Sequence, residues 1–147
     1  MRNLISRMKP EARECAAYCQ RFELQFPKLW PDLIHVANER RHRIENFVAK
    51  LLGVKPGVSD YLLAVPIGGY QGMWLEAKKT GATWSHVDPD QRVFLERRRA
   101  HGYFTAVGFG LDHMWEITLA YINEQPLDQH WAGSVRSVNA RRAKETD

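Results

Sequence analysis

Apolar residues recur at helical spacing in four stretches of the chain, and this pattern predicts amphipathic helices over 11–26, 41–53, 88–102 and 111–124. Proline is well suited to a first helical turn, and Pro10 and Pro89 stand at the start of two of these stretches. The second helix is expected to turn five apolar side chains inward: Ile44, Phe47, Val48, Leu51 and Leu52. The third is expected to bury three: Val93, Phe94 and Leu95.

Shorter runs rich in β-branched and aromatic residues predict strands over 33–37, 60–66, 72–78 and 103–109. The second and third of these form a hairpin that turns near Gly68 and Gly69. The resulting order, α-β-α-β-β-α-β-α, predicts one α/β domain over 1–125 with a mixed central sheet flanked by helices. Residues 126–147 are polar and basic, and we interpret them as a C-terminal tail.

The stretch "GMWLEAK" (72–78) carries an unusual pair of charges. Met73, Leu75 and Ala77 share one face of the predicted strand, so Glu76 and Lys78 share the other. A solvent-exposed ion pair would explain this spacing and would contribute at most about 1 kcal/mol to stability. A catalytic acid and base is the second explanation, but the two-residue motif alone favours the ion pair, because such short patterns often match by chance.

Asp60 begins the first strand of the predicted hairpin, and this position favours a catalytic site over a surface ion pair. A turn near Gly68–Gly69 puts Asp60 roughly opposite Lys78 and within side-chain reach of Glu76. Two neighbouring carboxylates repel each other unless a cation lies between them, and Mg²⁺ prefers such hard oxygen ligands. The pattern therefore indicates metal-dependent hydrolysis of a phosphate ester, with Lys78 stabilising developing charge.

The charge of the chain indicates which class of partner it binds. The 147 residues carry a net charge of +4, and positive charge is clustered in three basic runs, 39–43, 96–101 and 139–144. These runs favour a polyanionic partner, although a solvated surface is the alternative. No apolar run is long enough to span a membrane and no secretory signal is visible. Cys15 and Cys19 alone suit a reducing cytoplasm, and we interpret them as buried thiols.

Residues 53–103 resemble the virus-type replication-repair nuclease (VRR-NUC) domain of the PD-(D/E)XK nuclease superfamily. The motifs that carry the resemblance are "KPGVSD", "GMWLEAK" and "PDQRVFLERRRAHGY", and a weaker similarity extends to about Tyr121. The resemblance implies a restriction-endonuclease-like core and a Mg²⁺- or Mn²⁺-dependent DNA endonuclease that leaves a 5′-phosphate. Family members usually have proline where this chain has Ser59, a change expected to affect loop stiffness rather than metal ligands.

The resemblance also assigns roles to individual residues. It implies that Asp60, Glu76 and the backbone carbonyl of Ala77 bind the metal and that Lys78 is the catalytic lysine. A further acid is expected from the first helix, where Glu14 is preferred to Glu11. Both acids have an alternative explanation, since a helix dipole favours acids in the first turn.

Gln91 matches a glutamine that the family carries at the start of the helix after the catalytic strand, which implies a role in the active site. It also stands three residues after Asp88, which predicts a helix capping box. Both interpretations of Gln91 remain open. The expected DNA contacts are Arg40, Arg41, Arg43, Lys55 and Lys79.

Small stand-alone phage-type members of the family look like homodimeric resolvases of Holliday (four-way) junctions, which implies branched double-stranded DNA as partner. Four tryptophans could supply a dimer surface or could simply be buried: Trp30, Trp84, Trp115 and Trp131. The alternatives are a nuclease directed to flaps or nicks, a branched-DNA-binding module that does not cut, and a hydrolase of small phosphorylated molecules. The last of these leaves the basic runs unexplained.

Overall fold

A computed structural model of the protein describes residues 2–37 and 46–124. Its centre is a four-stranded sheet in the order β1-β2-β3-β4. The strands are β1 (Leu33–His35), β2 (Tyr61–Leu63), β3 (Met73–Lys78) and β4 (Phe104–Phe109). The first three are antiparallel neighbours, whereas β3 and β4 run parallel. The sheet is therefore mixed, as the sequence predicts.

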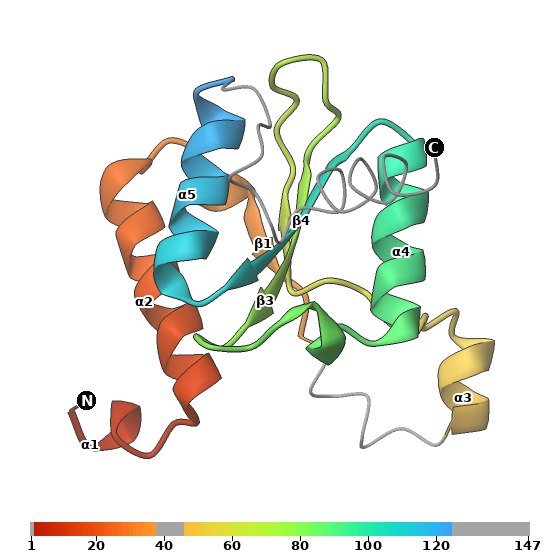
Figure 1. Ribbon diagram of the computed structural model, residues 1–147, viewed down its shortest axis with the longest axis horizontal. Coiled ribbons are helices and arrows are strands. Elements are labelled where there is room, and N and C mark those ends of the chain that lie inside the picture. Colours follow the sequence, from red (N-terminus) through yellow and green to blue (C-terminus); the bar gives the residue numbers. More distant parts are fainter. Residues whose placement is uncertain (1, 38–45, 125–147) are drawn as a thin grey trace.

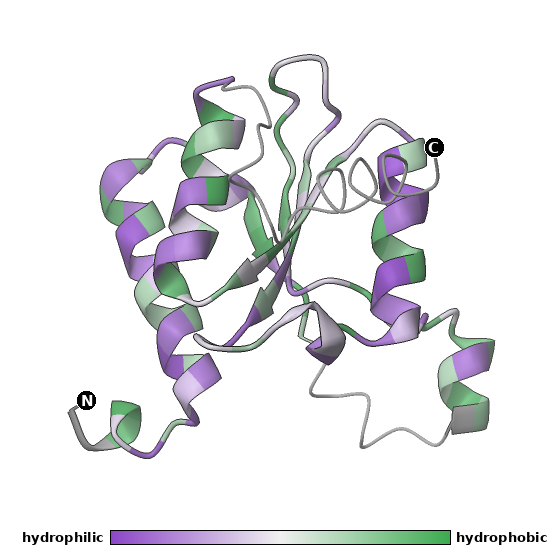
Figure 2. Ribbon diagram, in the orientation of Figure 1, coloured by the Kyte–Doolittle hydropathy of each residue, from purple (hydrophilic) through white to green (hydrophobic). Residues whose placement is uncertain are grey.

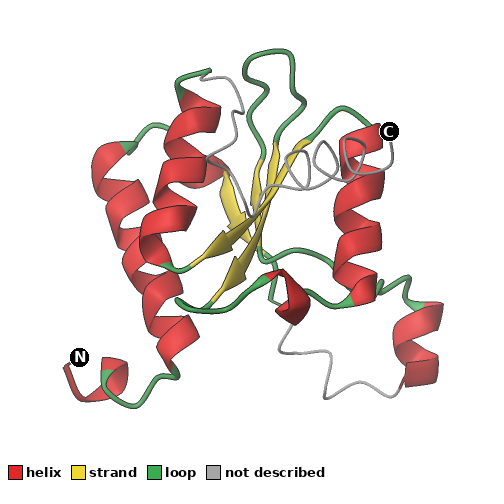
Figure 3. Ribbon diagram, viewed as in Figure 1, coloured by secondary structure: helices red, strands yellow, loops and turns green. Residues whose placement is uncertain are grey.

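Helices cover both faces of the sheet (Figures 1 and 3). The helices α2 (Pro10–Gln25) and α5 (Leu111–Ile122) pack together on one face, and α4 (Pro89–Ala100) packs on the other. Because a parallel pair cannot be joined by a hairpin, the chain crosses from β3 to β4 through α4. The shorter elements are α1 (Arg2–Ile5), α3 (Asn46–Leu51) and the 3₁₀ turns η1 (Trp30–Asp32) and η3 (Trp84–His86). The sequence pattern missed α1, whose four residues are too few to show a period.

The alternation along β3 divides the interior into two clusters. Met73, Leu75 and Ala77 are buried with Tyr18 and Phe22 against α2 and α5. On the opposite face, a smaller cluster is formed by Val87, Leu95 and Val107, with Trp74 packed against it. Glu76 and Lys78 belong to this second face, because they alternate with the first set along the strand.

Two expectations about burial are wrong. Four side chains at the predicted inward positions of the second helix are exposed: Phe47 (70 %), Val48 (41 %), Leu51 (71 %) and Leu52 (69 %). The helix there is short and lies apart from the sheet, so its apolar side has no core to face (Figure 2). Ile44 lies outside the described residues. Val93 is also exposed, because successive residues in α4 point about 100° apart: Leu95 is buried in the smaller cluster and Phe94 meets the Trp74 ring of β3, whereas Val93 faces outward.

Three of the four tryptophans are partly buried in the protein, which was the alternative to a dimer surface. Trp30 and Trp115 are partly buried against the larger cluster, and Trp84 packs against the smaller one, with the Arg92 guanidinium 5.1 Å from its ring centre. Several expectations concern residues that the structure does not describe: Trp131, the tail 126–147 and the basic runs 39–43 and 139–144. Within the described residues, no helix is long and apolar enough to cross a membrane.

Candidate active site

The β2–β3 hairpin brings Asp60 to Glu76. Gly68 and Gly69 both have positive φ, the conformation that a tight two-residue hairpin turn requires, so the predicted turn is confirmed. The register pairs Tyr61 with Leu75, and its continuation puts Asp60 beside Glu76. The expectation that Asp60 faces Lys78 is wrong. The bridge Ile67–Tyr70 leaves one more residue on the first arm of the hairpin than on the second, and this extra residue shifts the pairing.

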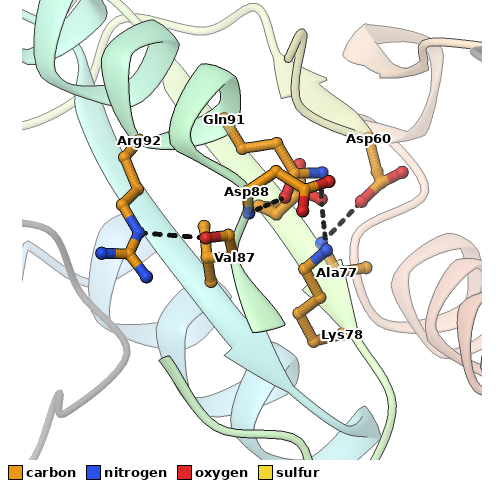
Figure 4. A network of polar contacts seen from close by, with 8 residues as sticks. Asp60, Ala77, Lys78, Val87, Asp88, Gln91 and Arg92 are labelled. Atoms are coloured by element: carbon orange, nitrogen blue, oxygen red, sulfur yellow. Dashed lines mark hydrogen bonds and ion pairs between the residues drawn. The ribbon is translucent and has the colours of Figure 1, made fainter. Parts of the chain in front are cut away.

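Figure 4 shows the side chains that converge at this end of β3. Asp60 Oδ2 accepts a hydrogen bond from the backbone N–H of Ala77 at 2.7 Å. Glu76 Oε1 accepts a hydrogen bond from Gln91 Nε2 at 2.6 Å and lies 3.5 Å from Lys78 Nζ. Glu76 Oε2 is buried and has no hydrogen-bond partner among the described residues. The buried carboxylate is thus held through one oxygen while the other is unused.

The side chain of Glu76 is 3 % exposed and that of Lys78 is 16 % exposed, which excludes the interpretation of an ordinary surface ion pair. Burial, and then the charge of Asp60, raise the pKa of Glu76 to about 8, although the Lys78 ammonium opposes the shift. Burial also raises the pKa of Asp60, against the hydrogen bond from Ala77. Two acids are therefore kept where their ionised forms are unfavourable, an arrangement found most often at functional sites.

Gln91 forms the predicted capping box and contacts Glu76 at the same time. Its side-chain oxygen accepts the N–H of Asp88 at 2.9 Å, which is the glutamine half of a capping box at the start of α4. Its side-chain nitrogen is the donor to Glu76. One amide group therefore ties the start of α4 to the acid on β3.

Gly57 fixes the loop that leads to Asp60 against the same helix end. Its φ is +74°, and a Cβ built on it would collide with the backbone carbonyl of Asp90 and approach the N–H of Gln91 to 2.6 Å. Only glycine allows the loop to come so near. Ser59, which follows in this loop, is fully buried, so the position where relatives have proline is a packed one.

The two acids of the first helix lie in different surroundings. Glu14 accepts hydrogen bonds from the backbone N–H of Thr80 at 3.0 Å and from the Thr80 hydroxyl. Glu11 lines a cleft that also contains Asp60, and its charge contributes to raising the pKa of Asp60. The contact of Glu14 with Thr80 was not foreseen, since nothing in the pattern around Thr80 distinguishes it from a loop residue.

Across residues 2–37 and 46–124, no three histidine, cysteine or acidic side chains gather as a metal site. The available donors are the Asp60 and Glu76 carboxylates and backbone carbonyls. Of the expected DNA contacts, Lys55 and Lys79 are exposed, and both are close in sequence to site residues. Arg40, Arg41 and Arg43 lie outside the described residues.

Comparison with solved structures identifies the fold. No family model matches the chain, and no curated protein matches it in sequence. A solved structure described as a "VRR_NUC domain protein" superposes with a TM-score of 0.67 at 24 % identity, over 78 % of this chain and 89 % of that one. The chain has the VRR-NUC fold. This confirms the α/β fold class with its mixed, helix-flanked sheet, and the VRR-NUC likeness reaches well beyond residues 53–103, where the motifs lie.

The pKa of Glu76 gives a first prediction, for the metal-free protein. The pKa of about 8 keeps a proton on Glu76 in the folded state, whereas the unfolded state loses it near the ordinary glutamate pKa of 4.5. Stability should therefore fall as pH rises through this window. This fall is measured by thermal unfolding in EDTA at a series of pH values from about 5 to about 8.5, in steps of about half a pH unit. Glu76→Gln should flatten the dependence, and an unchanged slope in this variant would refute the assignment.

Proposed function

We propose that the protein is a Mg²⁺- or Mn²⁺-dependent DNA endonuclease that hydrolyses phosphodiesters. One observation carries the proposal: Asp60 and Glu76 form a buried pair of carboxylates. Glu76 Oε2 has no hydrogen-bond partner among the described residues, and the Lys78 ammonium lies beside Glu76 Oε1. A divalent cation fits this donor set, because Mg²⁺ is commonly held by one or two carboxylates and otherwise keeps its waters or binds substrate phosphates. It would also offset the repulsion between the two acids.

In this proposal Asp60, Glu76 and the carbonyl of Ala77 hold the metal. The bound metal supplies an acidified water and neutralises charge on the phosphate. Gln91 positions Glu76 through Oε1 and so leaves Oε2 for the cation. Lys78 orients the attacking water or stabilises the charge that develops on the phosphoryl oxygens. For the additional acid the geometry favours Glu11, which shares a cleft with Asp60, over Glu14, which is engaged by Thr80.

DNA is the proposed substrate because of charge. The chain is basic, and exposed Lys55 and Lys79 stand next in sequence to the loop and strand that form the site. The rival proposal of a DNA-binding module without catalysis is disfavoured, because a binder gains nothing from two buried acids where a phosphate must approach. Arg97 to Arg99, the basic run that the structure describes, end α4, where they also complement the helix dipole.

The trio of Asp60, Glu76 and Lys78 is tested by substitution. Asp60→Asn and Glu76→Gln should each remove most of the cleavage, because each deletes a ligand charge, and Lys78→Ala should slow it on the order of 100-fold while metal still binds. Cleavage of labelled DNA in Mg²⁺, Mn²⁺ or EDTA and calorimetric metal titration give the two readouts. Lys28→Ala, which removes a remote exposed charge, is the control. Wild-type rates in either acid variant would sink the assignment.

Gln91 allows its two hydrogen bonds to be separated. Gln91→Glu retains an acceptor for the Asp88 N–H but loses the donor to Glu76 and adds a third negative charge. Thermal stability should fall, because the new carboxylate faces buried Glu76, and cleavage should fall roughly 10- to 100-fold, the usual effect of losing a group that orients a metal ligand. A variant that cuts normally would show that Gln91 is a helix cap alone.

We further propose that two copies act together on branched DNA, with four-way junctions as the favoured form. One metal site cuts one strand, and the resolution of a junction needs two cuts related by a two-fold axis, which a symmetric dimer supplies. Since three of the tryptophans are partly buried, the apolar side of α3 is the better surface for a second copy. It presents Phe47, Leu51 and Leu52, each about 70 % exposed.

Light scattering should give about twice the chain mass of 17.0 kDa, and a four-way junction should be cut by paired symmetric nicks. The double variant Leu51→Lys, Leu52→Lys should be monomeric and should lose the pairing of the nicks. Leu24→Lys changes an equally exposed leucine on α2 and should leave the mass unchanged. A monomeric wild type that nicks flaps and ignores junctions would overturn the dimer and leave the metal site standing.

A further inference from the structure

A cleft of about 490 Å³ lies between α2 and the strands β1 and β2, and Asp60 stands in its lining. Tyr61, Cys15, Cys19, Ala12 and His35 line it as well. Small-molecule sites typically measure about 300–1,000 Å³, so the cleft has the size of a ligand site. Since Asp60 belongs both to this cleft and to the proposed metal site, a group bound in the cleft would be next to the reacting phosphate.

The inner part of the cleft is uncharged. Burial raises the pKa of Cys15 to about 12 and also raises that of Cys19, so both thiols stay neutral at physiological pH. Tyr61 is 2 % exposed, and its hydroxyl accepts a hydrogen bond from Cys19 Sγ at 3.5 Å. The cleft therefore offers a preformed, weakly polar surface.

His35 provides an aromatic wall at the open side. Its ring meets Tyr61 edge to face with the centroids 5.0 Å apart, and the residue is exposed. Tyr61 thus holds the imidazole from one side. An aromatic ring held in this manner is a platform for stacking a planar group, as in proteins that bind unpaired bases.

The charges in the lining select against an anion. Glu11 and Asp60 contribute negative charge, and Lys9 is the one lysine or arginine there. A second phosphate would be repelled, whereas a neutral planar ring would not. Beside a scissile phosphate, the neutral planar group within reach is the base of an adjoining nucleotide.

We propose that this cleft, which we call the base cleft, receives the unpaired base of a nucleotide that adjoins the scissile phosphate. The inference rests on the proposed function and specifies its substrate: DNA that is branched, looped or otherwise unpaired at the cut. A base stacked inside a duplex cannot enter unless it is first rotated out of the helix. The enzyme is then directed by the exposed base and by phosphates, without a sequence code.

The test compares two DNA duplexes that differ in one group. One carries a single unpaired thymidine, and the other carries an abasic residue at the same position. Anisotropy titration in EDTA gives the affinity for each, and cleavage in Mn²⁺ gives the rate. The wild type should bind the thymidine DNA about tenfold more tightly, the usual effect of one stacked base.

Ala12→Leu fills the cleft and His35→Ala removes the platform, and both should bring the affinity ratio close to one. Each has a matched control: Ala17→Leu makes the same change on α2 outside this cleft, and Ile34→Ala truncates the neighbouring exposed residue of β1. Both controls should keep the tenfold ratio. A wild-type ratio near one, or a ratio unaltered in both cleft variants, would overturn the base cleft.

The two proposals fail in distinguishable ways. A protein that retains the affinity ratio but cuts neither DNA with any metal would remove the proposed hydrolysis and support the base cleft. A protein that cuts and binds both DNAs equally would support the hydrolysis and refute the base cleft.

Discussion

Glu76 retains 2 % of its accessible surface, and its environment explains how a carboxyl group persists inside the sheet. Burial alone would be unfavourable for the ionised form, and Asp60 makes it more so. Two neighbours compensate in part: the Gln91 amide and the Lys78 ammonium both approach Oε1. Oε2 receives nothing from the described residues. Glu76 is therefore favoured as a protonated acid, and in the proposed function a cation would stabilise its ionised form.

The position of α4 depends on the same interaction. Gln91 caps this helix and holds Glu76 with the two ends of one amide, so the start of α4 cannot move without disturbing the acid. Gly57 adds a steric constraint from the loop before Asp60, which packs directly on the backbone of Asp90. Three segments distant in sequence thus meet at one point: the loop before β2, strand β3 and the first turn of α4. The precision of the acid pair comes from this meeting, because none of the three segments is rigid by itself.

The side of the sheet that α2 covers has a different chemical environment from the α4 side. There α2 packs its aromatic residues into the larger cluster, and its first turns border the cleft that Asp60 also lines. Cysteine and tyrosine keep the inner part of that cleft uncharged, whereas the α4 side gathers the Glu76 and Lys78 charges. Asp60 stands between these two environments, since it directly precedes β2, lines the cleft and neighbours Glu76. The proposed hydrolysis and the proposed base cleft therefore share Asp60, and they also share Glu11, the favoured additional acid.

Periodicity by itself determined the order of the long elements, the hairpin turn and the common face of Glu76 and Lys78, because these depend on local backbone geometry. The resemblance to the VRR-NUC family came from the motif residues themselves and not from any period. Tertiary structure alone decided the pairing of Asp60 with Glu76, since one extra residue in the hairpin arm shifts the register without changing the pattern. It decided that the apolar side of α3 is exposed, because a helical period shows that a face is apolar but not what covers it. It placed Glu11 and Glu14 in different surroundings and brought the Gln91 cap into contact with Glu76, since distance across the fold, rather than spacing along the chain, sets which groups touch.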